Sequence, residues 1–177
     1  MTRSAPDLRI PVGVVIERRK ATNPWADYVW RPVAILPGRP EVAPWTELGR
    51  QGDATSFYAG DTEVLLFHAD TPRYRDNLQS GTPSLWVVLR PTDDEPPFGV
   101  VTVTADSSEG EGYTAAGADL VDFVPMPDAI RDAIAAFVAE HHVEQEFFKL
   151  PRKASDPEAL ARRPRGDKRT RVTGDDH

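Results

Sequence analysis

The stretch PDAIRDAIAAFVAEHHVEQEFFKL, residues 127–150, is the longest run in this chain with the pattern of an α-helix. With successive residues turned by about 100°, Ile130, Ile134 and Phe137 fall on one face, which predicts an apolar stripe. Pro127 stands at the first turn, where proline is tolerated because its missing N–H has no helical partner there. A small sheet with one apolar face needs a cover. We therefore expect this helix to pack over a sheet formed by the residues that precede it.

The residues before the helix have the pattern of short strands separated by turns. Gly60 and Asp61 predict a tight hairpin turn between two of these strands. A loop is expected at residues 37–53, which are rich in glycine and proline, and short helices are expected at residues 72–79 and 109–116. Apolar runs, alternating or rich in β-branched residues, predict strands at residues 10–18, 28–36, 55–58, 62–67, 84–90, 99–104 and 120–124.

This order of elements predicts the fold class. Strands that do not alternate with helices imply mostly antiparallel pairing. We expect an α+β fold: a mostly antiparallel sheet or partly open barrel of about seven strands, covered by one long C-terminal helix. Residues 1–9 are expected to be a flexible arm, residues 10–150 a single α+β domain, and residues 151–177 a charged, disordered tail. The strand at residues 84–90 is expected at the centre of the sheet, and the strand that contains Pro32 at an edge.

Composition and charge exclude several classes of protein. The chain has 177 residues, no cysteine and a formal net charge of −7, so thiolate chemistry and disulfides are excluded. Residues 1–150 hold 13 basic and 23 acidic side chains, and this acidic body argues against nucleic acid binding. No apolar run approaches the ~20 residues needed to cross a bilayer, and none resembles a signal sequence. We therefore expect a cytoplasmic protein that binds neither nucleic acid nor membrane.

The long helix carries the first candidate site, the adjacent pair His141 and His142. Glu146 lies one turn after His142, so this part of the helix offers metal-ligating side chains. Adjacent helical residues diverge by about 100°, however, which prevents the two histidines from easily holding one ion. The spacing HExxH is also absent. Three roles therefore stay open for the pair: a core or interface role, partner binding with Glu146, and metal binding.

A second candidate site is a dense aromatic set near the first two strands. Trp25, Tyr28, Trp30 and Trp45 lie close together in sequence, with Arg31 beside them. Tryptophan, tyrosine and arginine are favoured at protein–protein contacts. The same residues also serve as core and loop anchors in small β-rich domains. We take Trp25, Trp30 and Arg31 as partner-binding candidates.

Motifs for catalysis are missing from the sequence. There is no G-x-S-x-G elbow, no glycine-rich nucleotide loop of the form G-x-G-x-x-G, and no thiol nucleophile. The sequence therefore predicts no catalytic residues, no cofactor and no bound metal. A non-catalytic role is favoured over an enzymatic one.

Five segments carry a resemblance to a known family: IPVGVVIERR, NPWADYVWRPVAILPG, PSLWVVLR, VPMP and FVAEHHVEQ. The match runs roughly over residues 10–157. With them the chain resembles an uncharacterised proteobacterial family of small cytoplasmic proteins. Genes of that family tend to lie beside genes for molybdenum-containing formate dehydrogenases. The resemblance implies an accessory or maturation role for such an enzyme, exerted by binding a protein partner. The alternative function is binding of a small ligand or metal near the end of the long helix.

Overall fold

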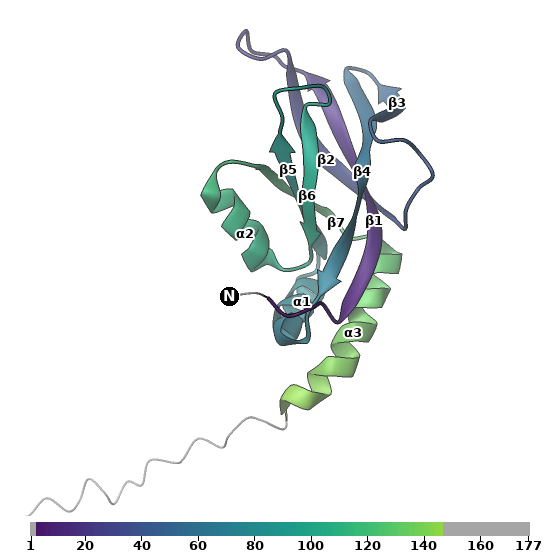
Figure 1. The fold of residues 1–177 in the computed structure, drawn as a ribbon, viewed down its shortest axis with the longest axis vertical. Coiled ribbons are helices and arrows are strands. Elements are labelled where there is room, and N and C mark those ends of the chain that lie inside the picture. The colour runs from purple at the N-terminus through teal and green to yellow at the C-terminus, as the bar shows by residue number, and fades with distance from the viewer. Residues whose placement is uncertain (1–2, 147–177) are drawn as a thin grey trace, which may run out of the picture. The chain divides into compact units, whose positions relative to one another are not determined.

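The structure, a computed structural model, describes residues 3–146, with side chains described as far as His141 (Figure 1). This part of the chain contains seven strands, one short 3-10 helix and three α-helices. In order these are β1 (Leu8–Lys20), β2 (Tyr28–Pro37), β3 (Thr46–Gln51), β4 (Ala54–Leu66), the 3-10 helix η1 (His68–Asp70), α1 (Thr71–Gln79), β5 (Ser84–Pro91), β6 (Phe98–Thr104), α2 (Ser107–Ala116), β7 (Leu120–Pro125) and α3 (Asp128–Glu146).

The strands form two separate antiparallel sheets. The first has the order β2-β1-β4-β3 and the second has the order β6-β5-β7. Within residues 3–146 no ladder joins the two sheets, although β4 packs beside β6 and β2 beside β7. β5 lies at the centre of its sheet and β2 at an edge of the other, as the sequence predicts. The register of β2 against β1 shifts between Val15 and Ile16. Ile16 pairs with Pro32, which has no N–H to donate to the ladder.

The predicted arrangement of one sheet or partly open barrel under a single long C-terminal helix is wrong, although the α+β class is right. The two sheets share one core, so each sheet covers much of the other's apolar face. Three α-helices, not one, pack against them. Only residues 128–146 of the expected helix at 127–150 form a described helix, and residues 147–150 and the predicted tail lie outside the described residues.

The predicted hairpin turn at Gly60 and Asp61 is also wrong, because β4 runs unbroken through both residues. Gly60 has φ +139°, a conformation suited to glycine, and it lies where the register between β1 and β4 shifts. The actual turn lies at Gly52, between β3 and β4. β3 lies inside the stretch expected to be a loop. All six of its residues are exposed, so its sequence has no apolar pattern that would identify a strand.

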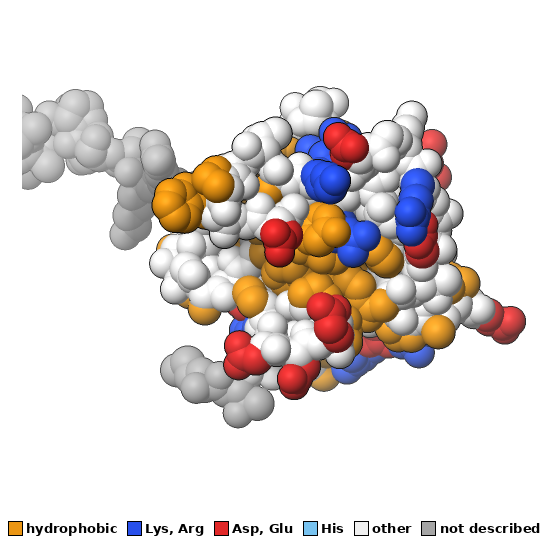
Figure 2. All heavy atoms as spheres, turned by 90° about the horizontal axis from the view of Figure 1, so that it is seen from above, with side chains coloured by type: hydrophobic (Ala, Val, Ile, Leu, Met, Phe, Trp, Pro, Cys, Tyr) orange, Lys and Arg blue, Asp and Glu red, His pale blue; other side chains and the backbone are white. Residues whose placement is uncertain are grey.

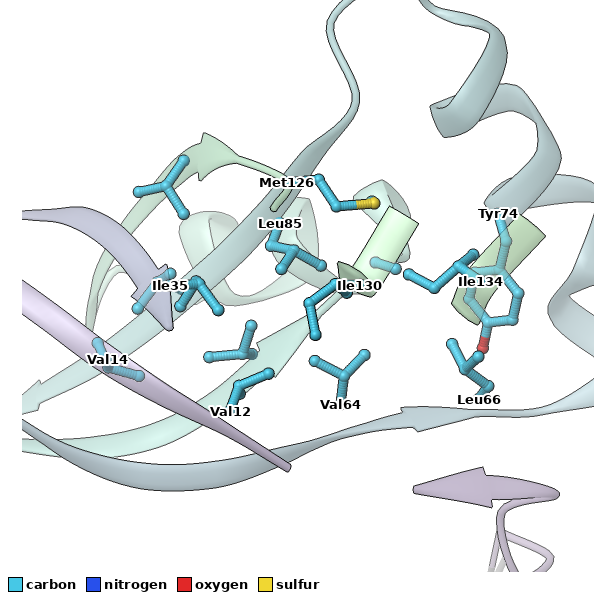
Figure 3. Packing of buried hydrophobic residues seen from close by; sticks show 14 of the residues in the cluster. Val12, Val14, Ile35, Val64, Leu66, Tyr74, Leu85, Met126, Ile130 and Ile134 are labelled. Carbon is cyan, nitrogen blue, oxygen red and sulfur yellow. The ribbon is translucent and has the colours of Figure 1, made fainter. Parts of the chain in front are cut away.

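All three α-helices follow strands that end on the same side of the sheets, and we name this side the helix-covered end (Figure 1). Ile130 and Ile134 of α3 are fully or almost fully buried there. Figure 3 shows Ile130 lying between Leu85 of one sheet and Val64 of the other, so α3 closes the core that the sheets share. Tyr74 of α1 completes this cover, and its hydroxyl oxygen accepts a hydrogen bond of 3.0 Å from the Phe67 N–H.

The opposite side carries no described helix. Three turns close it, at residues 21–27, 52–53 and 92–97, and we name it the loop end (Figure 1). Across the described residues, none of the helices combines the length and apolar character needed to cross a membrane.

Candidate functional site

The loop end holds a cluster of aromatic rings around Trp30. The centroid of the Trp30 ring lies 5.9 Å from that of Trp45, 5.9 Å from that of Phe57 and 5.8 Å from that of Phe98. The rings come from β2, β4, β6 and the residue before β3, so strands of both sheets contribute. All four side chains are only partly buried. The core of the protein therefore ends at this side in a partly open layer of aromatic rings.

Arg18 extends this layer with a positive charge. Its guanidinium carbon lies 4.4 Å from the ring centroid of Tyr28, 5.1 Å from that of Phe57 and 5.7 Å from that of Trp30. These distances are those of cation–π contacts. Among the residues described, no carboxylate forms an ion pair with Arg18. Glu47 and Glu95 lie near Arg18 without forming an ion pair with it, so its N–H groups can still bind another molecule.

We call Arg18, Tyr28, Trp30, Trp45, Phe57 and Phe98 the aromatic surface. A hollow of about 350 Å³ opens into it, with Pro96 and Pro97 on its rim. Figure 2 looks onto the loop end and shows a continuous hydrophobic area bordered by acidic and basic side chains. An apolar centre with a charged border is the usual composition of a protein–protein contact.

Trp45 adopts a strained backbone conformation within the aromatic surface. Its φ is +68°, and it is the single non-glycine residue among those described with a positive φ. Such conformations are rare for bulky side chains and cost roughly 1–3 kcal/mol. Its indole packs against Trp30 and Phe57. The strain is thus tolerated at a place where it directs an indole into the aromatic surface.

Trp25 lies beside the aromatic surface, in the 21–27 turn, and is 91% exposed. Asn23 holds the turn, because its Oδ1 accepts hydrogen bonds from the N–H groups of Trp25 (3.1 Å) and Ala26 (3.0 Å). An indole this exposed contributes almost nothing to the core. Trp25 is therefore a solvent-facing side chain on a hydrogen-bonded turn, and tryptophan is of the residue type that dominates binding energies at interfaces.

The six residues predicted to bind a partner do not form one site. Trp25 and Trp30 lie together at the loop end. Arg31 follows Trp30 on β2, where side chains alternate between faces, and its Nε lies 3.4 Å from Glu17 Oε1. His141 lies on α3 at the helix-covered end, on the opposite side of the sheets from the loop end. His142 and Glu146 belong to the backbone of α3, but their side chains lie outside those described.

His141 is half-buried and packs against another side chain of its own helix. Its ring centroid lies 4.3 Å from that of Phe137 and 6.2 Å from that of His68. His68 Nδ1 is 2.9 Å from Asp7 Oδ2, which also accepts the His68 N–H at 2.7 Å. These hydrogen bonds lower the pKa of the Asp7 carboxyl. Over the described residues, no group of three or more histidine or acidic side chains is placed to hold a metal ion.

Sequence reasoning missed Arg18, Phe57 and Phe98 as members of the aromatic surface. A signal for Arg18 is present in β1, where Val14, Ile16 and Arg18 share a face at period two. The apolar face of this strand therefore ends in a cation. The signal for Phe57 and Phe98 is weaker, because an aromatic residue at or near the start of a strand is also typical of a core position.

Fold and surface together define a small α+β protein whose two antiparallel sheets present aromatic side chains and one arginine at the loop end. The chain belongs to the DUF3305 family of proteins of unknown function, whose profile matches residues 11–151. A search of the curated proteins finds no significant match to the chain, and a search of the solved structures finds none either.

Proposed function

We propose that this chain is a cytoplasmic, non-catalytic accessory protein that binds a protein partner through the loop end. The observation that carries the proposal is the contrast between Trp25, which is 91% exposed, and the rings of Trp30 and Trp45, which pack against each other at the same end of the fold. Binding energy at interfaces concentrates in a few tryptophan, tyrosine and arginine side chains surrounded by apolar contacts. The aromatic surface and Trp25 supply these side chains in one place.

The charge of the surface supports the same proposal. Arg18 rests on aromatic rings, so its side chain is already ordered before a partner arrives. Ordering a long side chain on binding costs roughly 0.5–1.5 kcal/mol, and here much of that cost has been met in the free protein. A carboxylate of the partner fits the unpaired edge of this guanidinium.

We further propose that the partner is a subunit of a molybdenum-dependent formate dehydrogenase, and that the chain assists its maturation. This step rests on the sequence resemblance to a proteobacterial family whose genes lie beside those of such enzymes. The membership in a family of unknown function agrees with the resemblance and does not name a partner.

The test is co-purification from the native host with the tagged full-length chain as bait, in three versions. The wild-type chain is expected to recover a molybdoenzyme subunit. Trp25→Ala is expected to lower its recovery at least tenfold, since hot-spot tryptophans contribute about 2 kcal/mol or more. Phe123→Ala is the matched control because Phe123 is an exposed aromatic residue (58%) of β7, outside the aromatic surface. It is expected to recover as much partner as the wild type.

Two outcomes contradict the proposal separately. Equal recovery by Trp25→Ala and wild type shows that the partner does not bind at the loop end. A specific, Trp25-dependent partner that is not a molybdoenzyme subunit keeps the binding surface and removes the formate dehydrogenase assignment.

A further inference from the structure

A second hollow lies at the helix-covered end, away from the aromatic surface. It has a volume of about 420 Å³ and opens between α1, the start of β5 and the N-terminus of α2. This volume falls within the range of pockets that hold small molecules, roughly 300–1,000 Å³. We call it the α1–α2 pocket.

The walls of the pocket are tied together by hydrogen bonds. The Asn77 side chain of α1 donates to the carbonyl oxygens of Ser84 (2.8 Å) and Ala105 (3.0 Å), and its Oδ1 accepts the Ser84 N–H (3.0 Å). Across the pocket, Asp106 Oδ1 accepts the Ser108 N–H at the start of α2 (2.9 Å). Because these bonds join α1, β5 and α2, the pocket is formed before any ligand binds, which lowers the cost of binding.

Two aromatic side chains form the apolar wall. The ring centroids of Trp86 and Phe123 lie 5.4 Å apart, and both residues line the pocket. α2 approaches the indole of Trp86 so closely that a Cβ on Gly110 would lie 2.6 Å from it. Gly110 therefore fixes the indole against the helix. Phe123 is 58% exposed and has an aromatic partner only in Trp86 among the described residues.

The charge around the pocket disfavours anions. Arg73 lines it, but its guanidinium is bound to two carboxylates, at 2.8 Å to Asp106 and 3.4 Å to Asp70. The Asp106 side chain is 4% exposed and that of Asp70 12%, so both negative charges are held close to the arginine. Asp76 is the one carboxylate among the residues that line the pocket itself. Arg3 also pairs with Asp70, so Arg3 and Arg73 together face three carboxylates, and a phosphate would meet net negative charge.

The rest of the lining donates and accepts hydrogen bonds without charge. Ser107 and Ser108 of α2 present hydroxyls on one side and Thr82 presents one on the other. The hydroxyls of Ser80 and Ser84 already donate to the carbonyl oxygens of Asn77 (2.7 Å) and Thr82 (2.8 Å), so toward a ligand they can only accept. A flat apolar wall, several hydroxyls and a carboxylate match a ligand with a flat heteroaromatic ring, hydroxyl groups and an amino group. A nucleoside with an exocyclic amino group has all three.

We infer that the α1–α2 pocket is a binding site for an uncharged, amino-bearing nucleoside. The ring packs against Trp86 and Phe123, the exocyclic amino group donates to the Asp76 carboxylate, and the sugar hydroxyls bond to the serines. The site excludes phosphorylated forms by charge. It is independent of the loop end, so the chain can hold a nucleoside with or without a protein partner.

The test is a titration of the full-length chain followed by backbone and indole N–H signals in NMR spectra, with two matched pairs of ligands. Adenosine and inosine differ in the amino group, and adenosine and AMP differ in the phosphate. Adenosine is expected to shift the indole signal of Trp86 and the amide signals of Ser107 and Ser108. It is expected to bind about fivefold or more tightly than either inosine or AMP. Inosine loses one charge-assisted hydrogen bond because it lacks the amino group, and AMP adds a repulsive negative charge.

Two variants and a control separate this site from non-specific stacking. Ser107→Phe fills the pocket from an exposed position and is expected to weaken adenosine binding at least tenfold. Ala115→Phe places the same side chain at an exposed position near the other end of α2, outside the pocket lining, and is expected to bind as the wild type does. Asp76→Asn is expected to bring the affinities for adenosine and inosine within about twofold, because the charged acceptor is gone.

Three results overturn the inference. The first is the absence of shifts at Trp86, Ser107 and Ser108 with adenosine and cytidine up to about 5 mM, which is weaker than any specific site. The second is unchanged adenosine affinity in Ser107→Phe. The third is tighter binding of AMP than of adenosine, which would assign the pocket to anions.

Discussion

The two ends of this molecule finish the same core in different ways. At the helix-covered end, α1 and α3 place Tyr74, Ile130 and Ile134 over the sheets, and each of these side chains is at most 2% exposed. At the loop end no described helix follows the strands, and the core stops at the half-buried rings of Trp30 and Trp45. The same two sheets are therefore sealed by the chain itself on one side and left with an open aromatic layer on the other.

This difference separates residues that stabilise the fold from residues that are free for binding. A buried aliphatic side chain at the helix-covered end stabilises the fold because its apolar surface is removed from water. A tryptophan in the 21–27 turn buries little apolar surface in the free protein, so it contributes to the free energy of binding when a partner covers it and not to the stability of the fold. Substitutions at the two ends should consequently act on different quantities.

The largest effect on stability is expected for Ile134→Ala at the helix-covered end. Ile134 is fully buried in the core that the two sheets share, so its truncation leaves a cavity and should lower the free energy of unfolding by about 2–5 kcal/mol. Trp25→Ala should change it by no more than about 0.5 kcal/mol, because Trp25 is solvent-exposed. Urea denaturation of both variants measures the contrast. Similar losses in the two variants would contradict the division between the ends.

A smaller loss is expected for Gly110→Ala. The added Cβ would lie 2.6 Å from the Trp86 ring, so α2 or the indole must move, at a cost of about 1–3 kcal/mol. Gly112→Ala is the control, since nothing lies within 4 Å of a Cβ at that position of the same helix. There the better helix propensity of alanine should leave stability unchanged or slightly raised. Thermal unfolding of the two variants distinguishes the close approach from a general effect of glycine.

Tyr74 gives the helix-covered end a dependence on alkaline pH. Burial raises the pKa of Tyr74 from its ordinary value of 10.0 to about 12. The neutral phenol therefore stabilises the folded state fully below pH 10, and this contribution is lost as the pH rises toward 12. Tyr74→Phe should remove the tyrosine-dependent part of the stability loss between pH 10 and 12. It should also cost about 1–2 kcal/mol at neutral pH, because the Phe67 N–H loses its acceptor.

Unfolding measured from pH 8 to 12 in Tyr74→Phe and wild type tests this expectation. A stability curve of the same slope in both proteins would show that Tyr74 titrates normally.

The smallest effect concerns the strained backbone of Trp45 at the loop end. Replacing Trp45 by alanine keeps a Cβ at φ +68°, whereas glycine adopts this conformation without steric cost. Trp45→Gly should therefore be more stable than Trp45→Ala by about 1 kcal/mol, although both lose the ring contacts. The reverse order in urea denaturation would show that the backbone relaxes once the indole is removed.

The sequence predicts the elements of this fold better than their assembly. The α+β class, the central place of β5, the edge position of β2 and the two short helices all follow from local patterns. The division into two sheets does not follow from them. Alternation of apolar and polar residues identifies a strand, but it does not show which distant strand that strand pairs with. The turn at Gly52 was missed for a related reason: β3 is exposed along its whole length, so it has no apolar face to detect.

The candidate site was predictable only in part. Tryptophans clustered in sequence indicated the loop end, and Trp25 and Trp30 do lie there. Helix geometry alone predicts that adjacent residues such as His141 and His142 point in directions about 100° apart. The neighbours of His141 could not be predicted, because Asp7 and His68 reach it from segments more than 70 residues away in the chain. The α1–α2 pocket is likewise built from three separate stretches of the chain, at residues 73–86, 107–108 and 123, and its serines look like ordinary loop residues in the sequence.

Hydrogen–deuterium exchange of the chain alone and in complex with the partner recovered from the host tests the central claim most directly. If the partner binds at the loop end, amide protection should rise in residues 21–30 and 45–58, which carry Trp25 and most of the aromatic surface. The amides of α1 and α3 should exchange as they do in the free protein. Protection confined to α1 and α3, with the 21–27 turn unchanged, would contradict the account and move the partner to the helix-covered end.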